Sequence, residues 1–167
     1  EAEIREQRTR ALYEVARQLA GALTLEQVIE IMQHFVRMQF DAAAVVVLPE
    51  EYSHLKPAVQ PVSDCSIDNL LARMAGESGK TVRRDEFSGN GHASLYLPLR
   101  ASMRTRGVMA IAFPNDTLVV PDEHIALLEA LASLVAIALE RLHYVDVAQG
   151  SQLKIVSERL RSSILSA

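Results

Sequence analysis

"ASLYLPLRASMRTRGVMAIAF", residues 93–113, contains the two strongest strand signals of the chain. Its outer parts, 93–100 and 107–113, are apolar runs of the kind that suits strands, and the charged connection "ASMRTR" joins them. Two such runs predict an antiparallel β-hairpin with a loop longer than two residues. An antiparallel sheet is therefore the expected centre of the fold.

Three segments upstream of this hairpin are also predicted to be strands. The run "AAAVVVL", Ala42–Leu48, is too short for a typical helix and rich in Val, which predicts a central strand covered on both faces. Residues 55–59 are predicted to return as an edge strand, because Pro57 has no amide hydrogen to donate. "TVRR", 81–84, is a third short strand, and the polar segment 85–92 after it is predicted to be a loop.

Apolar residues at helical spacing predict four helices. The first spans about residues 2–21, and the second follows a Thr24 capping box and ends near Met38. The third spans 67–75 and stops at Gly76, whose freedom to adopt a left-handed conformation suits a helix end.

The fourth helix is predicted to start at Pro121 and to continue almost to the last residue. Gly150 lies inside it and costs about 1 kcal/mol relative to Ala, so it is predicted to be a weak point or hinge. Together the elements predict an α+β fold, in which a central antiparallel sheet carries the N- and C-terminal helices on one face.

The stretch "GESGKT", 76–81, resembles the end of a nucleotide-binding P-loop. The strict pattern needs a glycine where this chain has Met74, and it needs a strand before the loop and a helix after it. Here the predicted order is helix, turn and strand. The motif is therefore interpreted as a helix stop and a turn rather than as an ATP site.

Composition excludes several classes of protein. The 167 residues are 49% hydrophobic and 23% charged, which fits one globular domain with extensions, and the net charge of −4 opposes binding to nucleic acid. Cys65 is the single cysteine, so no internal disulfide or thiolate metal cluster can form, and a reducing cytoplasm is the expected compartment. The apolar stretch Ile125–Leu139 contains Glu129 and is too short to span a bilayer, so it is predicted to be a buried helix.

The strands "LYLPLR" and "GVMAIAF", followed by the helix "PDEHIALLEALASLVAIALERL", resemble a GAF domain. The segments "IALERL", 137–142, and "ERLRSSILSA", 158–167, are similar to the connection between the GAF-like domain and the phosphoacceptor helices in KdpD-type potassium-responsive sensor histidine kinases. The resemblance implies a linker helix at 1–21, a GAF-like domain at 22–142 and a connecting helix at 143–167 that leads to a phosphoacceptor domain.

The same resemblance implies partners and a location. We expect a fragment of a longer protein, which would be a cytoplasmic domain of an inner-membrane kinase. Its partners would be the kinase core of the parent chain and a second copy, with a response regulator reached only through the parent. No residue of this segment is expected to transfer phosphate, and no cofactor is expected.

GAF domains can hold small ligands between one sheet face and the helix and loops above it. Here that position would bring together Met74, Arg84, Asp85, Phe87, His92 and Tyr96, which offer a mixed polar and aromatic lining for an unidentified small ligand. The competing interpretation is that the charges are solvated and that Tyr96 is ordinary strand packing.

Known GAF chemistries do not match these residues. The residue set that binds cyclic nucleotides cannot be placed, and Cys65 lacks the following His of a bilin-attachment site. Reduction of free methionine sulfoxide would need a second, resolving thiol. The five histidines show no metal-ligand spacing, so no metal site is expected.

The end of the fourth helix carries an apolar stripe, predicted to pair with a second copy, that consists of Leu142, Leu153, Val156, Leu160 and Ile164. We therefore expect a non-catalytic domain that relays a signal through paired helices. The alternatives are a small-molecule-binding GAF module that controls another output, such as a transcription regulator or cyclase, and a stand-alone redox enzyme.

Overall fold

A computed structural model describes residues 2–48, 68–84, 93–102, 104–114 and 116–166. In chain order the elements are α1 (Ala2–Gly21), α2 (Leu25–Phe40), β1 (Ala43–Val47), α3 (Asn69–Ser78), β2 (Val82–Arg84), β3 (Ser94–Arg100), β4 (Thr105–Ala112) and α4 (Asp122–Ser166). The predicted α+β fold is confirmed. The predicted edge strand at 55–59 and the predicted loop at 85–92 lie outside the described residues.

The described strands form one antiparallel sheet in the order β1-β4-β3-β2. The hairpin of β3 and β4 is confirmed, but its loop is shorter than predicted. Arg100 pairs with Thr105, and the Ala101 amide donates to the Arg104 carbonyl at 3.0 Å. Thr105 and Arg106 therefore belong to the strand, which places the Arg106 side chain inside the protein.

Strand β1 is covered on both faces at its start, as predicted, because the adjacent residues Ala44 and Val45 are both buried. In the described residues β1 pairs with β4 alone, and its candidate second partner, 55–59, is not described. A Cβ atom at Gly107 would lie 2.7 Å from the Val47 carbonyl oxygen. This close approach explains the glycine at the start of β4.

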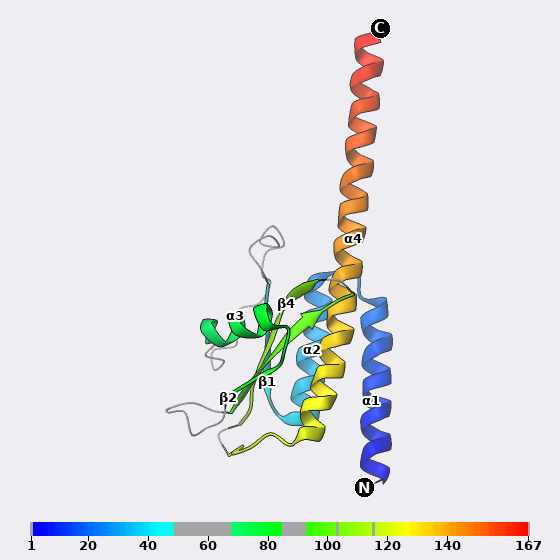
Figure 1. Ribbon diagram of the computed structural model, residues 1–167. Coiled ribbons are helices and arrows are strands. Elements are labelled where there is room, and N and C mark those ends of the chain that lie inside the picture. Colours follow the sequence, from blue (N-terminus) through cyan, green and yellow to red (C-terminus); the bar gives the residue numbers. More distant parts are fainter. Residues whose placement is uncertain (1, 49–67, 85–92, 103, 115, 167) are drawn as a thin grey trace.

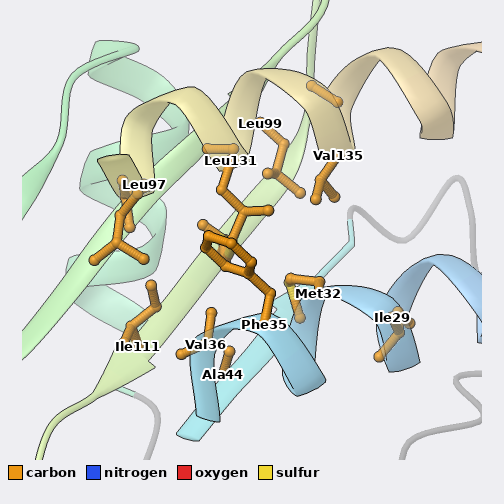
Figure 2. Close-up of a cluster of buried hydrophobic side chains, with 14 of the residues drawn as sticks. Ile29, Met32, Phe35, Val36, Ala44, Leu97, Leu99, Ile111, Leu131 and Val135 are labelled. Atoms are coloured by element: carbon orange, nitrogen blue, oxygen red, sulfur yellow. The ribbon is translucent and has the colours of Figure 1, made fainter. Parts of the chain in front are cut away.

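Helices α2 and α4 cover one face of the sheet and α3 covers the other, as Figure 1 shows. Helix α1 packs against α2 and α4, so the two terminal helices lie on the same side of the molecule. Figure 2 shows the core between α2, α4 and the sheet, where side chains such as Met32, Phe35 and Leu131 interdigitate. This aliphatic core holds α4 against the strands.

The second helix begins at the predicted cap. The Gln27 amide donates to Thr24 Oγ1 at 3.3 Å, while the Gln27 side chain accepts from the Leu23 amide at 2.7 Å. The helix ends at Phe40, two residues beyond the predicted end, because Asp41 adopts a left-handed conformation with φ of 52° and caps it.

The predicted end of the third helix is wrong by three residues. Asp68 caps the start of α3, and Gly79, with φ of 66°, ends it. Gly76 lies inside the helix, where an added Cβ would lie 3.4 Å from Val108 on β4. Gly76 thus serves the close packing of α3 on the sheet, and Gly79 supplies the left-handed residue.

Helix α4 is 45 residues long and continues unbroken through Gly150. At 1.5 Å per residue it measures roughly 68 Å. Its first half packs on the domain, and from Tyr144 to Leu165 its residues are exposed. Figure 1 shows this second half extending alone beyond the rest of the chain.

Candidate functional site: the base of the long helix

The point where α4 leaves the domain carries a buried ion pair. Arg106 of β4 is only 4% exposed in its side chain, and its Nη2 lies 3.4 Å from Glu140 Oε1 on α4. The Arg106 guanidinium carbon also lies 5.8 Å from the centre of the Tyr144 ring, a cation–π distance. The pair joins the central hairpin directly to the long helix.

The next residue on α4 joins the same helix to α1. Arg141 donates to the carbonyl oxygens of Ala20 at 2.7 Å, Leu19 at 3.0 Å and Ala22 at 2.6 Å. Helix α1 has no basic residue in its own last turn, so Arg141 supplies the positive charge that a helix C-terminus favours.

A second contact joins the other ends of the two helices. Arg8 of α1 donates to Glu123 at 3.2 Å, and its Nη2 lies 3.0 Å from His124 Nε2. The His124 ring meets Phe40 edge-on, with 5.1 Å between ring centres. Burial lowers the pKa of His124 below its ordinary value, the Arg8 charge lowers it further and Glu123 opposes the shift.

These two contacts show that α1 and α4 run in the same direction. The early residue Arg8 contacts the start of α4, and the end of α1 contacts Arg141. A displacement of α1 along its axis would therefore act on α4 through both ends. The arrangement suits mechanical transmission between the two ends of the chain.

A groove of about 290 Å³ lies beside this base. Its walls are the turn between α1 and α2 (residues 23–26), Leu48 after β1, and the face of α4 that carries Leu142, Val145 and Gln149. The lining is mainly aliphatic, with the carboxylates of Glu26 and Asp146 at its rim. The groove marks how far up α4 the domain reaches.

The residues predicted to line a ligand pocket are only partly brought together. Tyr96 is buried beneath α3 and its hydroxyl accepts the Asp68 amide at 3.0 Å, while Arg84 Nη1 lies 3.7 Å from Asp68 Oδ2. Met74 is half exposed on α3. Asp85, Phe87 and His92 lie outside the described residues.

The space between α3 and the sheet holds a second packed cluster. Its buried members are Ala72, Ala75, Tyr96, Val108 and Ala110. The small alanines let the helix lie close to the strands. Arg84 and Tyr96 thus meet at the start of α3, where they hold Asp68.

The predicted pairing stripe is exposed where it leaves the domain. Leu142 is half buried against the core, whereas Leu153, Val156, Leu160 and Ile164 are between 54% and 75% exposed. Exposed aliphatic side chains in a row are uncommon on a helix without a partner.

The stretch that resembles a P-loop has the predicted order of helix, turn and strand. Lys80 follows the Gly79 cap, and Thr81 Oγ1 donates to Glu129 Oε1 on α4 at 2.9 Å. A shallow groove of about 440 Å³ passes over these residues and Arg100. The stretch does not form the phosphate-cradling turn of a P-loop.

The described residues offer neither a metal-ligand cluster nor a membrane-spanning helix. They hold no group of three His, Cys, Asp or Glu side chains that could bind a metal ion. Among the same residues, no helix combines the length and hydrophobicity needed to cross a bilayer.

Sequence reasoning missed the ion pair and the Arg141 contact. The sequence pattern places Arg106 in the predicted hairpin loop, and it assigns no role to Glu140 or Arg141. The available signal was an arginine directly before the apolar run that begins at Gly107, together with an adjacent Glu and Arg near the end of an apolar helix.

Comparisons with known proteins agree with this architecture. A family model described as GAF domain matches residues 24–141. The sensor protein KdpD of Escherichia coli (strain K12) is 29% identical over 167 residues, which cover 99% of this chain and 19% of that protein. The chain thus spans about a fifth of the length of this relative.

Solved structures extend the comparison. The GAF domain of the potassium sensor histidine kinase KdpD from Escherichia coli matches with a TM-score of 0.68 and 26% identity, over 84% of this chain and 99% of that one. The free methionine-R-sulfoxide reductase from Neisseria meningitidis matches with a TM-score of 0.64 and 13% identity, over 83% and 91% of the two chains. At 13% identity the second match shows the fold alone.

Proposed function

The chain belongs to the GAF domain family, and we propose that it is the regulatory, non-catalytic domain of a KdpD-like sensor histidine kinase. The observation that carries the proposal is that the similarity to KdpD covers 99% of the chain, so it includes the long helix as well as the domain. The stimulus of the parent would be potassium or osmotic conditions.

The proposed mechanism is conformational. A change at the sheet, or a shift of α1, moves α4 through the Arg106–Glu140 pair and the Arg141 contact. Helix α4 then changes its separation from a paired copy and biases the kinase core between two states. In this scheme residues 1–21 are the input helix, 22–142 the domain and 143–167 the output helix.

The proposed setting follows the same relative. The domain would lie on the cytoplasmic side of an inner-membrane protein and act as a homodimer. The kinase core would follow in the parent chain, and the response regulator would meet the parent rather than this domain.

Self-association of the 167-residue chain tests the pairing. Val156→Lys combined with Leu160→Lys places two charges in the stripe and is expected to abolish the dimer in sedimentation velocity. Ile155→Lys combined with Leu165→Lys is the control, because these exposed residues lie on the opposite side of α4 and add the same charge. If both double variants associated equally, pairing through the stripe could not be part of the mechanism.

The coding sequence after Ala167 tests the identity of the parent. A phosphoacceptor block containing His within about thirty codons, the length of a few heptads, is the expected result. Another output domain would contradict the assignment to a sensor kinase.

A small-ligand site remains a second proposal for the same domain. It would consist of Met74, Arg84, Asp85, Phe87, His92 and Tyr96, and the support for it is that Arg84 and Tyr96 both contact Asp68 at the start of α3. A screen of small ligands by thermal shift, repeated on Arg84→Ala, tests it. Stabilisation that is unchanged in Arg84→Ala would place the ligand elsewhere.

A further inference from the structure

The apolar stripe of the free half of α4 lies on the same face as the buried residues of its first half. With 100° of rotation per residue, the two sets lie within roughly 60° of the direction of Leu142. The buried set is Leu128, Leu131, Val135 and Leu139, and the exposed set is Val145, Leu153, Val156, Leu160 and Ile164. The stripe therefore points toward the side of α4 on which its own domain lies.

Residues of the domain wall a groove on this side of α4 up to Gln149. The groove at the base of α4 is walled by residues 23–26 and Leu48 on one side and by Leu142, Val145 and Gln149 on the other. Below that level the sheet and α2 cover the face. Beyond Gln149 the stripe is exposed and, among the described residues, no part of the domain walls it, so it is open to another helix there.

This geometry conflicts with a straight parallel pair. Two packed helices lie about 8–10 Å apart, and two-fold symmetry would place each partner helix on the face that the domain of the other copy already occupies. Two straight copies of α4 in parallel would bring the two domains into the same space. The upper halves can meet in parallel only if the lower halves diverge.

The first residue above the groove is Gly150, the least helix-favouring residue of α4. No atom of the described residues lies within 4 Å of the position that a Cβ would take there, so their packing does not explain the missing side chain. A bend at this residue would separate the lower halves and leave Leu153, Val156 and Leu160 free to pair.

We propose that α4 bends at Gly150 when two copies pair, and that the straight helix is the unpaired state. The inference rests on the proposed parallel pairing, and it adds that α4 must bend for the pairing to occur. Pairing and straightness of α4 then exclude one another, which gives the relay two distinct states. The partner of the stripe is a second copy of this chain. The stripe of that copy has the same apolar spacing, and it too begins above the level at which the domain lies beside α4.

The test uses the 167-residue chain with Cys65→Ser and Ile164→Cys. In a parallel pair the two copies of position 164 face each other and form a disulfide on oxidation, whereas in an antiparallel pair position 164 faces the region of Gly150. Gly150→Ala is expected to weaken self-association in sedimentation equilibrium. The difference in helix propensity between Gly and Ala should raise the dissociation constant about fivefold for each helix that bends. Because both helices of the dimer bend, the expected total is about 25-fold.

Gly150→Ala combined with Ser157→Gly is the control. It keeps one glycine in the exposed half but moves it into the paired segment, so it is not expected to restore association. Retained cross-linking with equal or tighter association of Gly150→Ala would overturn the bend and leave the pairing intact. Absence of the cross-link at position 164 in the chain with Gly150 would overturn parallel pairing, and with it the bend.

Discussion

At the scale of single residues, the Arg141 side chain of α4 supplies hydrogen-bond donors to the C-terminal end of α1. Its guanidinium donates three hydrogen bonds to the carbonyl groups of Leu19, Ala20 and Ala22, at the end of α1 and just beyond it, where a helix lacks amide donors of its own for its last carbonyl groups. Hydrogen bonds from charged groups are worth more than neutral ones, and a cation at a helix C-terminus adds a favourable interaction with the helix dipole.

We therefore expect Arg141→Ala to lower the free energy of unfolding by about 2 kcal/mol. Urea unfolding followed by circular dichroism measures the change. Arg161→Ala, on the exposed half of α4, is the matched control and should change stability by less than about 0.5 kcal/mol. Equal effects of the two substitutions would show that the contact with α1 contributes nothing.

At Gly107 the described part of the sheet leaves no room for a side chain. A Cβ there would lie 2.7 Å from the Val47 carbonyl, so Gly107→Ala must move β1 away from β4. We expect a loss of about 1–3 kcal/mol. Gly21→Ala is the control, because no atom in the described part of the chain lies within 4 Å of its added Cβ, and thermal unfolding of both variants should separate them clearly.

His124 makes stability depend on pH. Its pKa is lower in the folded chain than its ordinary value of 6.5, so the unfolded chain takes up the proton first as the pH falls. The contribution of neutral His124 to the free energy of unfolding is fully present above pH 6.5. It is lost as the pH falls from 6.5 through the pKa of His124 in the folded chain. Melting temperatures between pH 8 and pH 5 should therefore fall less in His124→Gln than in the unchanged chain, and identical slopes would contradict this role.

At the scale of elements, the Arg106–Glu140 pair connects β4 to α4. Removing one member of a buried ion pair leaves the other charge without its partner, which costs more than the pair itself contributes. A double-mutant cycle with Arg106→Met and Glu140→Gln is expected to give a coupling energy of about 1–3 kcal/mol. The exposed pair Arg73–Glu77 on α3 should give about 0.5 kcal/mol or less, and equal couplings would exclude a special role for the buried pair.

The elements were mostly predictable because their apolar spacing is regular. The hairpin, the Thr24 cap and the start of α4 all follow from local patterns. The errors arose where tertiary contacts decide at which residue a helix or strand begins or ends. Gly76 remains helical because Val108 lies against it, and the strand β4 begins at Thr105 because Arg100 pairs with it.

The base of α4 could not be predicted for the same reason. Arg106, Glu140 and Arg141 gain their roles from a strand and two helices that meet only in the fold. An arginine directly before an apolar run does not by itself show that it will be buried. The apolar stripe, in contrast, was visible in the spacing of Leu153, Val156 and Leu160; these side chains are exposed, and their pairing stays a prediction.

At the scale of the whole molecule, the proposed function requires that α4 carries a change out of the domain. Helices α1 and α4 run in the same direction and are joined near both ends of α1. The part of α4 from Gly150 to Ser166 is roughly 25 Å long and presents Leu153, Val156, Leu160 and Ile164 to solvent. In the proposed relay, the same helix of a second copy covers this surface.

Autophosphorylation of the parent kinase tests this relay most directly. Val156→Lys with Leu160→Lys in the parent should make the rate of autophosphorylation insensitive to the stimulus, because the stripe then no longer joins the two copies. The control pair Ile155→Lys with Leu165→Lys should keep the response. A normal response of the Val156 and Leu160 variant would contradict the relay through paired α4 helices.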